Sequence, residues 1–150
     1  MPSTQQGSFT LERIYPATRA RVFRAFADVK AKTKWFAGGD RWALLERRFD
    51  FRVGGSERLK GRWPDGTIST FDATYWDIVP DTRIVYCYAM HLGDRKISVS
   101  LATLEFEGAG QGTKLTLTEH GAFLDGYDDA GSRERGTGEL LDSLGKSLAN

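Results

Sequence analysis

Two glutamates occupy positions where strand alternation would otherwise place apolar side chains. Glu57 shares its phase with Leu59, and Glu119 shares its phase with Leu117, because successive side chains of a strand point to opposite faces. On the wall of an apolar pocket, burial would raise the pKa of a carboxyl group, which could orient a polar ligand or act as an acid or base. In the alternative interpretation, both glutamates lie at solvated strand ends and carry no chemistry.

The other reactive residue types form no catalytic or metal-binding set. His91 and His120 are the only histidines, and two scattered histidines with one cysteine make a poor zinc site. No serine stands in the sequence context of a nucleophile elbow. We therefore assign no catalytic residue and predict no metal and no cofactor. Cys87 lies within an apolar run and is predicted to be a buried small hydrophobe rather than a nucleophile.

The composition is that of an ordinary globular protein. Of the 150 residues, 40% are apolar and 27% are charged, with 21 Lys and Arg against 20 Asp and Glu. A net charge near zero gives no general attraction to nucleic acid or to a membrane. The densest basic run is interleaved with acidic residues, so we interpret it as solvated strand faces. It comprises Arg41, Arg47, Arg48, Arg52, Arg58, Lys60 and Arg62.

The chain is predicted to be a single cytoplasmic domain over residues 1–150, with an ordered core over residues 9–148. A lone cysteine favours a reducing compartment. The polar N-terminus shows no secretion signal, and no segment approaches the roughly 20 apolar residues of a membrane span.

The N-terminal part of the chain predicts one strand, at residues 10–14, and two short helices. Thr18 can cap a first helix, and Asp28 can begin a second one. The second helix leads to Trp35 and Phe36 and stops at Gly38-Gly39. The apolar face of the first helix comprises Val22, Phe23, Phe26 and Val29.

The remainder predicts an antiparallel sheet and a long terminal helix. Strands are expected at residues 43–49, 57–63, 68–79, 84–92, 96–107 and 113–120. Their short connections leave no room for crossover helices, so consecutive strands must pair in antiparallel fashion. Asp128 and Asp129 can cap a helix with Leu140, Leu141 and Leu144 on one face. Because a twisted sheet of this size curls, the helix can cross its concave face and leave space beneath.

Several segments together resemble a known superfamily. Residues 71–85 read FDATYWDIVPDTRIV, and residues 112–117 read GTKLTL. The segments 16–26, Trp35-Phe36, Gly54-Gly55 and Pro64-Asp65-Gly66 stand in matching order. This pattern resembles the START-related SRPBCC superfamily, in the branch similar to the C-terminal domain of the activator of the ninety-kilodalton heat-shock-protein ATPase.

The resemblance covers residues 9–148 and implies a fold and a pocket. The fold is the α+β helix-grip fold of START and birch-pollen-allergen proteins: a curved seven-stranded antiparallel sheet wrapped on a long C-terminal helix, with two short helices after the first strand. Where many relatives have Gly-Trp in the last helix, this chain has Gly136-Thr137, and the loss of that tryptophan would enlarge one end of the pocket or admit water to it. The superfamily does not share one reaction, since its members include lipid carriers, cyclases and cochaperone domains.

Strand phase, the terminal helix face and the resemblance together predict a ligand site. Its residues are Trp35, Phe36, Glu57, Leu59, Trp63, Phe71, Ala73, Tyr75, Leu117, Glu119, Gly136, Thr137 and Leu140.

Three functions are compatible with these residues. The leading hypothesis is a binding module for a small hydrophobic or aromatic molecule of lipid-like or polyketide-like character. The second is an interaction protein that stimulates a chaperone ATPase, with basic strands over residues 47–62 as its surface. The third is a cyclase or hydrolase that uses Glu57 or Glu119 in the pocket. We expect no nucleic-acid or membrane partner, and either a monomer or a homodimer.

Overall fold

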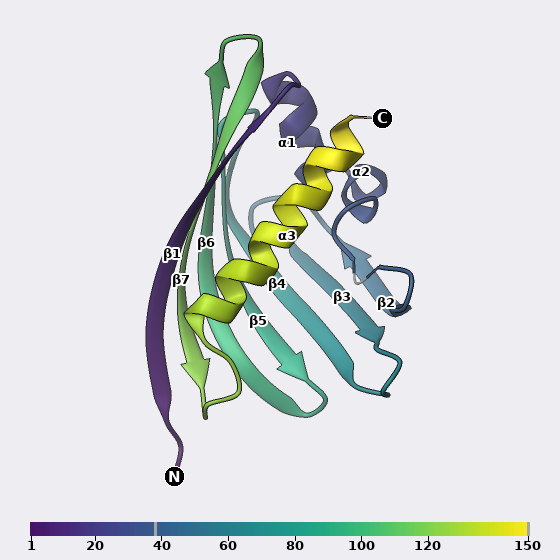
Figure 1. Cartoon of the computed structure of the whole chain (residues 1–150), viewed down its shortest axis with the longest axis vertical. Helices are drawn as coiled ribbons and strands as arrows, with labels where there is room; N and C mark the ends of the chain where they lie inside the picture. Colours follow the sequence, from purple (N-terminus) through teal and green to yellow (C-terminus); the bar gives the residue numbers. More distant parts are fainter. Residues whose placement is uncertain (38, 150) are drawn as a thin grey trace.

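The structure is a computed structural model that describes residues 1–37 and 39–149. Its strands are β1 (Thr4–Tyr15), β2 (Ala43–Phe49), β3 (Ser56–Arg62), β4 (Ile68–Val79), β5 (Arg83–Leu92), β6 (Arg95–Ala109) and β7 (Gly112–Leu124). Its helices are α1 (Arg19–Ala27), α2 (Val29–Thr33) and α3 (Ala130–Leu148). Figure 1 shows α3 crossing one face of the sheet. The predicted α+β helix-grip fold is confirmed.

The seven strands form one antiparallel sheet in the order β1-β7-β6-β5-β4-β3-β2. From β2 to β7 each strand pairs with its successor, as the short connections predicted. The turn between β3 and β4 contains Gly66 with a φ of 91°, a conformation that glycine adopts without steric cost. β1 and β2 lie at opposite edges, so α1 and α2 carry the chain from one edge to the other.

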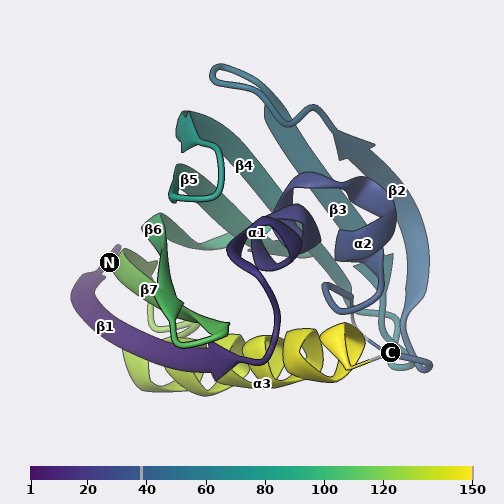
Figure 2. The same ribbon diagram turned by 90° about the horizontal axis from the view of Figure 1, so that it is seen from above.

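The sheet curls around its helices (Figure 2). Register shifts interrupt the pairing of β2 with β3, of β4 with β5 and of β5 with β6. Such bulges bend a strand and increase its local twist. All three helices lie on the concave side, with α3 beside β1 (Figures 1 and 2).

The two strands beside α3 are longer than their sequences predicted. β1 begins at Thr4 rather than Thr10, and β7 ends at Leu124 rather than His120. The two extensions pair with each other, from Thr4 opposite Leu124 onward. The polar residues at the start of β1 lack an alternating pattern, and cross-strand hydrogen bonding, which no local pattern encodes, makes them a strand.

The helix starts follow their predicted caps. Thr18 accepts a hydrogen bond from the backbone of α1, Asp28 from that of α2, and Asp129 from that of α3. Val29 was expected on the apolar face of the first helix, but it opens α2 and is 38% exposed. The reason is that α1 ends at Ala27, because Asp28 takes an extended conformation and starts a new helix. Gly38, predicted with Gly39 to stop the second helix, lies outside the described residues.

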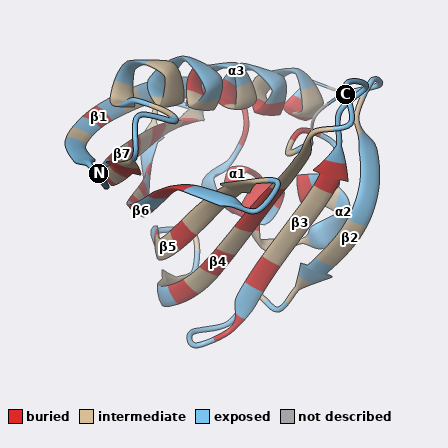
Figure 3. Cartoon of the chain, turned by 90° about the horizontal axis from the view of Figure 1, so that it is seen from below, coloured by how far each residue is buried: buried red, intermediate tan, exposed pale blue. Residues whose placement is uncertain are grey.

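The main core joins α1, α3 and the centre of the sheet. Phe23 and Phe26 of α1 pack edge to face against Phe106 of β6. Leu141 and Leu144 of α3 are 1% and 0% exposed, which confirms the predicted leucine face. Figure 3 shows buried positions along β4 and β5 and on one side of α3.

Cys87 is only half-buried, and the prediction of a buried hydrophobe is wrong. Its strand phase is opposite to that of Tyr86 and Tyr88, which line the concave side. The apolar run around it belongs to a strand with two partly covered faces.

Within the described residues, no helix has the length and apolarity that crossing a membrane requires.

Candidate functional site

A cavity of about 620 Å³ lies between the concave face of the sheet and α3, within the range of about 300–1,000 Å³ typical of ligand pockets. Much of the predicted site lines it. These residues are Trp35, Phe36, Leu59, Trp63, Phe71, Leu117, Glu119, Gly136, Thr137 and Leu140. A side chain added at Gly136 would meet open space.

Three predicted residues, Glu57, Ala73 and Tyr75, are buried but are not among the cavity-lining residues of the described chain. All three face the same side of the sheet as Phe71. Glu57 and Tyr75 lie under α2, where Lys32 contacts both. Ala73 packs in a buried apolar cluster with Phe71 and Tyr88. Strand phase identifies the face of a side chain and not its position along that face.

The prediction also missed a row of cavity residues on β5. Tyr86, Tyr88 and Met90 line the cavity, and Tyr88 and Met90 pair in register with Ala73 and Phe71 of β4. Their alternation is visible in the sequence, so the phase used for β4 could have identified them.

Two tryptophans border the cavity near the β3–β4 turn. The indole nitrogens of Trp42 and Trp63 both donate hydrogen bonds to Ser69 Oγ, at 3.4 and 3.3 Å. A side chain at Gly61 would overlap with the Trp42 indole, so glycine is required there for close packing. Trp63 is 38% exposed and Gly136 is exposed, so the cavity opens to solvent between this turn and α3.

The opposite end of the cavity is polar. Arg133 of α3 donates hydrogen bonds to the Tyr88 hydroxyl at 2.9 Å, to Ser98 Oγ at 2.7 Å and to Asp128 Oδ2 at 2.9 Å. Glu119 of β7 lies beside this group, is 3% exposed and also lines the cavity. Burial raises the pKa of Glu119 above its ordinary value, although a hydrogen bond with Tyr88 and the charge of Arg133 oppose the shift.

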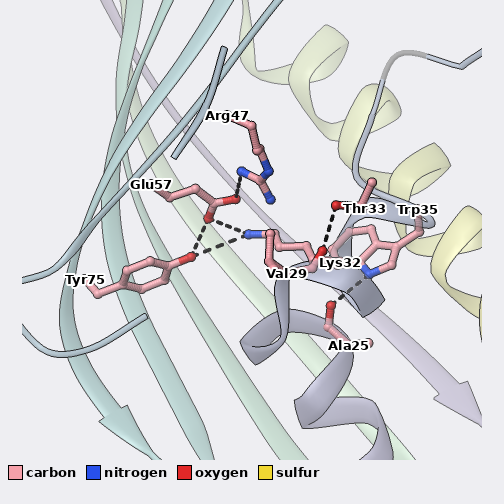
Figure 4. Close-up of polar contacts among 8 residues, drawn as sticks. All are labelled: Ala25, Val29, Lys32, Thr33, Trp35, Arg47, Glu57 and Tyr75. Carbon is pink, nitrogen blue, oxygen red and sulfur yellow. Dashed lines mark hydrogen bonds and ion pairs between the residues drawn. The ribbon is translucent and has the colours of Figure 1, made fainter. Parts of the chain in front are cut away.

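A second buried polar cluster lies under α2 (Figure 4). Glu57 is 1% exposed and binds two cations: Lys32 Nζ lies 2.7 Å from Oε1, and Arg47 Nη1 lies 2.7 Å from Oε2. The Tyr75 hydroxyl also donates to Glu57 Oε1. Lys32 Nζ lies 4.4 Å from the centre of the Phe36 ring, a cation–π contact. Phe36 is thus shared by this cluster and the cavity wall.

The charges in this cluster shift the pKa values of its members. Burial by itself would raise the pKa of Glu57, but the charges of Lys32 and Arg47 and the hydrogen bonds from Lys32 and Tyr75 lower it below the ordinary value. Burial lowers the pKa of Lys32, and Glu57 opposes that shift. Glu57 has partners on both oxygens, so it stabilises the fold and is not free to act on a ligand.

The structure therefore separates the two glutamates. Neither lies at a solvated strand end, because both are almost fully buried. Arg47 is also an exception to the interpretation of the basic run as solvated strand faces, since only 15% of its side chain is exposed. Other members of that run pair at the surface, as Arg58 does with Glu46 and Asp72. Within the described residues, no group of three or more His, Cys, Asp or Glu side chains could hold a metal ion.

A curled antiparallel sheet that encloses a cavity with a C-terminal helix defines a helix-grip protein. A comparison with protein families matches residues 16–149 to the model described as Activator of Hsp90 ATPase homolog 1-like protein. The chain belongs to this family, a branch of the SRPBCC superfamily. A search of curated proteins found no match.

Solved structures of the same fold include two similar proteins from rhizobia. An uncharacterised protein from Rhizobium leguminosarum is 44% identical, with 99% of this chain and 98% of that chain covered and a TM-score of 0.94. A protein from Rhizobium loti is 46% identical, with 97% and 99% covered and a TM-score of 0.90. A protein from Chromobacterium violaceum, 24% identical over 93% of this chain and 94% of that one with a TM-score of 0.76, shares the fold.

Proposed function

We propose that this protein binds a small hydrophobic or aromatic molecule in the cavity between the sheet and α3. The observation that carries the proposal is the cavity itself, whose walls are mostly aromatic and aliphatic. Tyr86, Tyr88 and Phe71 stand along one wall, and Leu140 of α3 stands on another. Flat aromatic side chains with a few polar groups at one end suit a flat apolar ligand.

The neutral fluorescent probe N-phenyl-1-naphthylamine tests this proposal. We expect saturable binding at one site in the wild-type protein. Thr137→Trp places in the cavity the residue type that many relatives have there. We expect it to lower the affinity for the probe by at least about tenfold, or 1.4 kcal/mol. Lys146→Trp adds the same side chain at an exposed position of α3 away from the cavity, and we expect it to bind like the wild type. Unsaturable binding, or equal binding by Thr137→Trp, would contradict the proposal.

A chaperone ATPase as partner is a second candidate, and the description of the matching family supports it. The expected result is a higher steady-state ATPase rate of a bacterial Hsp90 homologue when this protein is added. Replacement of the exposed Arg48 of β2 and Arg52 of the β2–β3 loop by alanine would then reduce the stimulation, because both belong to the basic surface over residues 47–62. An unchanged ATPase rate would exclude this activity.

A further inference from the structure

The polar end of the cavity contains a carboxylate with an unused acceptor. Glu119 lines the cavity, and its carboxylate shares a hydrogen bond with Tyr88. Its Oε2 atom has no hydrogen-bond partner among the described residues. A buried acceptor left unpaired destabilises the protein, because the hydrogen bonds it made to water are not replaced. A ligand that supplies a donor would remove this destabilisation.

Arg133, the cation beside Glu119, already has a counter-ion. It lies 2.9 Å from Asp128 Oδ2 and donates to two hydroxyl groups, those of Tyr88 and Ser98. Because the Tyr88 hydroxyl accepts from Arg133, its own proton can be donated to Glu119. The vacant oxygen of Glu119 is left for a group from outside the protein. The terminal torsion of a glutamate is broad, so the carboxylate can turn this oxygen toward the cavity.

The surroundings of Glu119 select the kind of donor. An anionic ligand would be repelled by Glu119 itself, and a charged group of either sign would lose its hydration between walls that are mostly aromatic and aliphatic. A neutral hydroxyl group avoids both conflicts, and an aromatic skeleton suits the walls formed by Phe71, Tyr86 and Leu117. We propose that the cavity binds a neutral aromatic compound bearing a hydroxyl group, which donates a hydrogen bond to the Glu119 carboxylate.

This inference rests on the proposed function, and a matched pair of probes tests the two separately. 1-Naphthol and 1-methoxynaphthalene share a ring system, but only the naphthol can donate a hydrogen bond. In displacement of N-phenyl-1-naphthylamine, we expect 1-naphthol to bind about tenfold more tightly, as for a hydrogen bond to a charged acceptor. Equal affinities, a preference for the ether, or no displacement by either compound would overturn the inference alone. Failure of N-phenyl-1-naphthylamine itself to bind would overturn the proposed function.

Two variants test whether the preference for 1-naphthol over 1-methoxynaphthalene comes from Glu119. In Glu119→Gln the amide oxygen keeps the hydrogen bond with Tyr88, so the amide nitrogen, a donor, takes the vacant position. We expect the preference for 1-naphthol to disappear or to reverse. Ser100→Ala is the control, because Ser100 is buried and its hydroxyl lacks a hydrogen-bond partner among the described residues, but it does not line the cavity. A preference that persists in Glu119→Gln, or that is lost in Ser100→Ala, would contradict the assignment.

Glu119→Gln is also expected to fold. Burial raises the pKa of the Glu119 carboxyl group in the folded protein. This group therefore contributes its full stabilisation at a pH below the pKa of an unfolded glutamate. The stabilisation is lost as the pH rises through the pKa of the folded protein. At neutral pH the uncharged amide avoids this loss. We therefore expect Glu119→Gln to unfold at a denaturant concentration no lower than the wild type, so that a change in binding reports on the site.

Discussion

Glu57→Gln is expected to lower the free energy of unfolding by about 3–5 kcal/mol, because it removes the carboxylate from a buried ion pair and leaves the partner charges uncompensated. Glu57 lies 2.7 Å from both Lys32 Nζ and Arg47 Nη1, and the side chain of Lys32 is 4% exposed. The amide can accept hydrogen bonds but cannot balance either charge. Urea denaturation at neutral pH measures the loss.

The stability that Glu57 contributes should depend on pH. Since its folded pKa lies below the ordinary value, the contribution is full above the unfolded pKa of about 4.3. It is lost as the pH falls through the folded pKa. The difference between wild type and Glu57→Gln should therefore be constant near neutral pH and should shrink in acid.

Asp77→Asn is the matched control for Glu57→Gln. Asp77 lies 2.6 Å from Arg83 Nε, but the two side chains are 41% and 48% exposed. Exposed ion pairs contribute about 0–1 kcal/mol, so we expect Asp77→Asn to change stability little. Similar losses of unfolding free energy in Glu57→Gln and Asp77→Asn would mean that burial does not strengthen the ion pairs of the cluster under α2.

Leu144→Ala is expected to cost about 2–5 kcal/mol of unfolding free energy, the range for a leucine removed from a packed core. Leu144 is 0% exposed and holds α3 against the core. The helix needs this packing, because its glycines each cost about 1 kcal/mol relative to alanine. Thermal or urea unfolding measures the effect.

Leu140→Ala is the comparison for Leu144→Ala. Leu140 is half-buried on the same helix and faces the cavity, where its removal enlarges an existing space instead of opening a new one. We expect a cost of about 1 kcal/mol, since only the transfer free energy of a half-buried side chain is lost and no new cavity is opened. An equal cost for the two leucines would indicate that the space under α3 is filled in solution.

Local patterns predicted most of the fold because the relevant interactions are local. Alternation with a period of two defines β4, and single capping residues such as Thr18 and Asp28 define the helix starts. The extension of β1 to Thr4 depends on pairing with Leu124, at the other end of the chain. No pattern within residues 4–9 encodes that pairing.

The candidate site was harder to predict, because its chemistry depends on tertiary contacts. The phase of Glu57 and Glu119 indicated burial equally well for both. Lys32 lies 25 positions before Glu57 in the sequence and stands on a helix too short to show a clear face. Only the folded arrangement shows that both oxygens of Glu57 have partners, whereas one oxygen of Glu119 has none among the described residues. Arg133 was missed for a related reason: the leucines of α3 marked the core face, and the cavity lies beside it.

The most direct test of the central claim, a ligand held under α3, is native mass spectrometry of the wild-type protein and Thr137→Trp, each purified from the protein's own host. We predict that wild-type protein carries an additional small molecule of defined mass that dissociates on activation, and that Thr137→Trp lacks it. Wild-type protein with only the mass of the polypeptide, or the same adduct on both proteins, would contradict a ligand in this cavity.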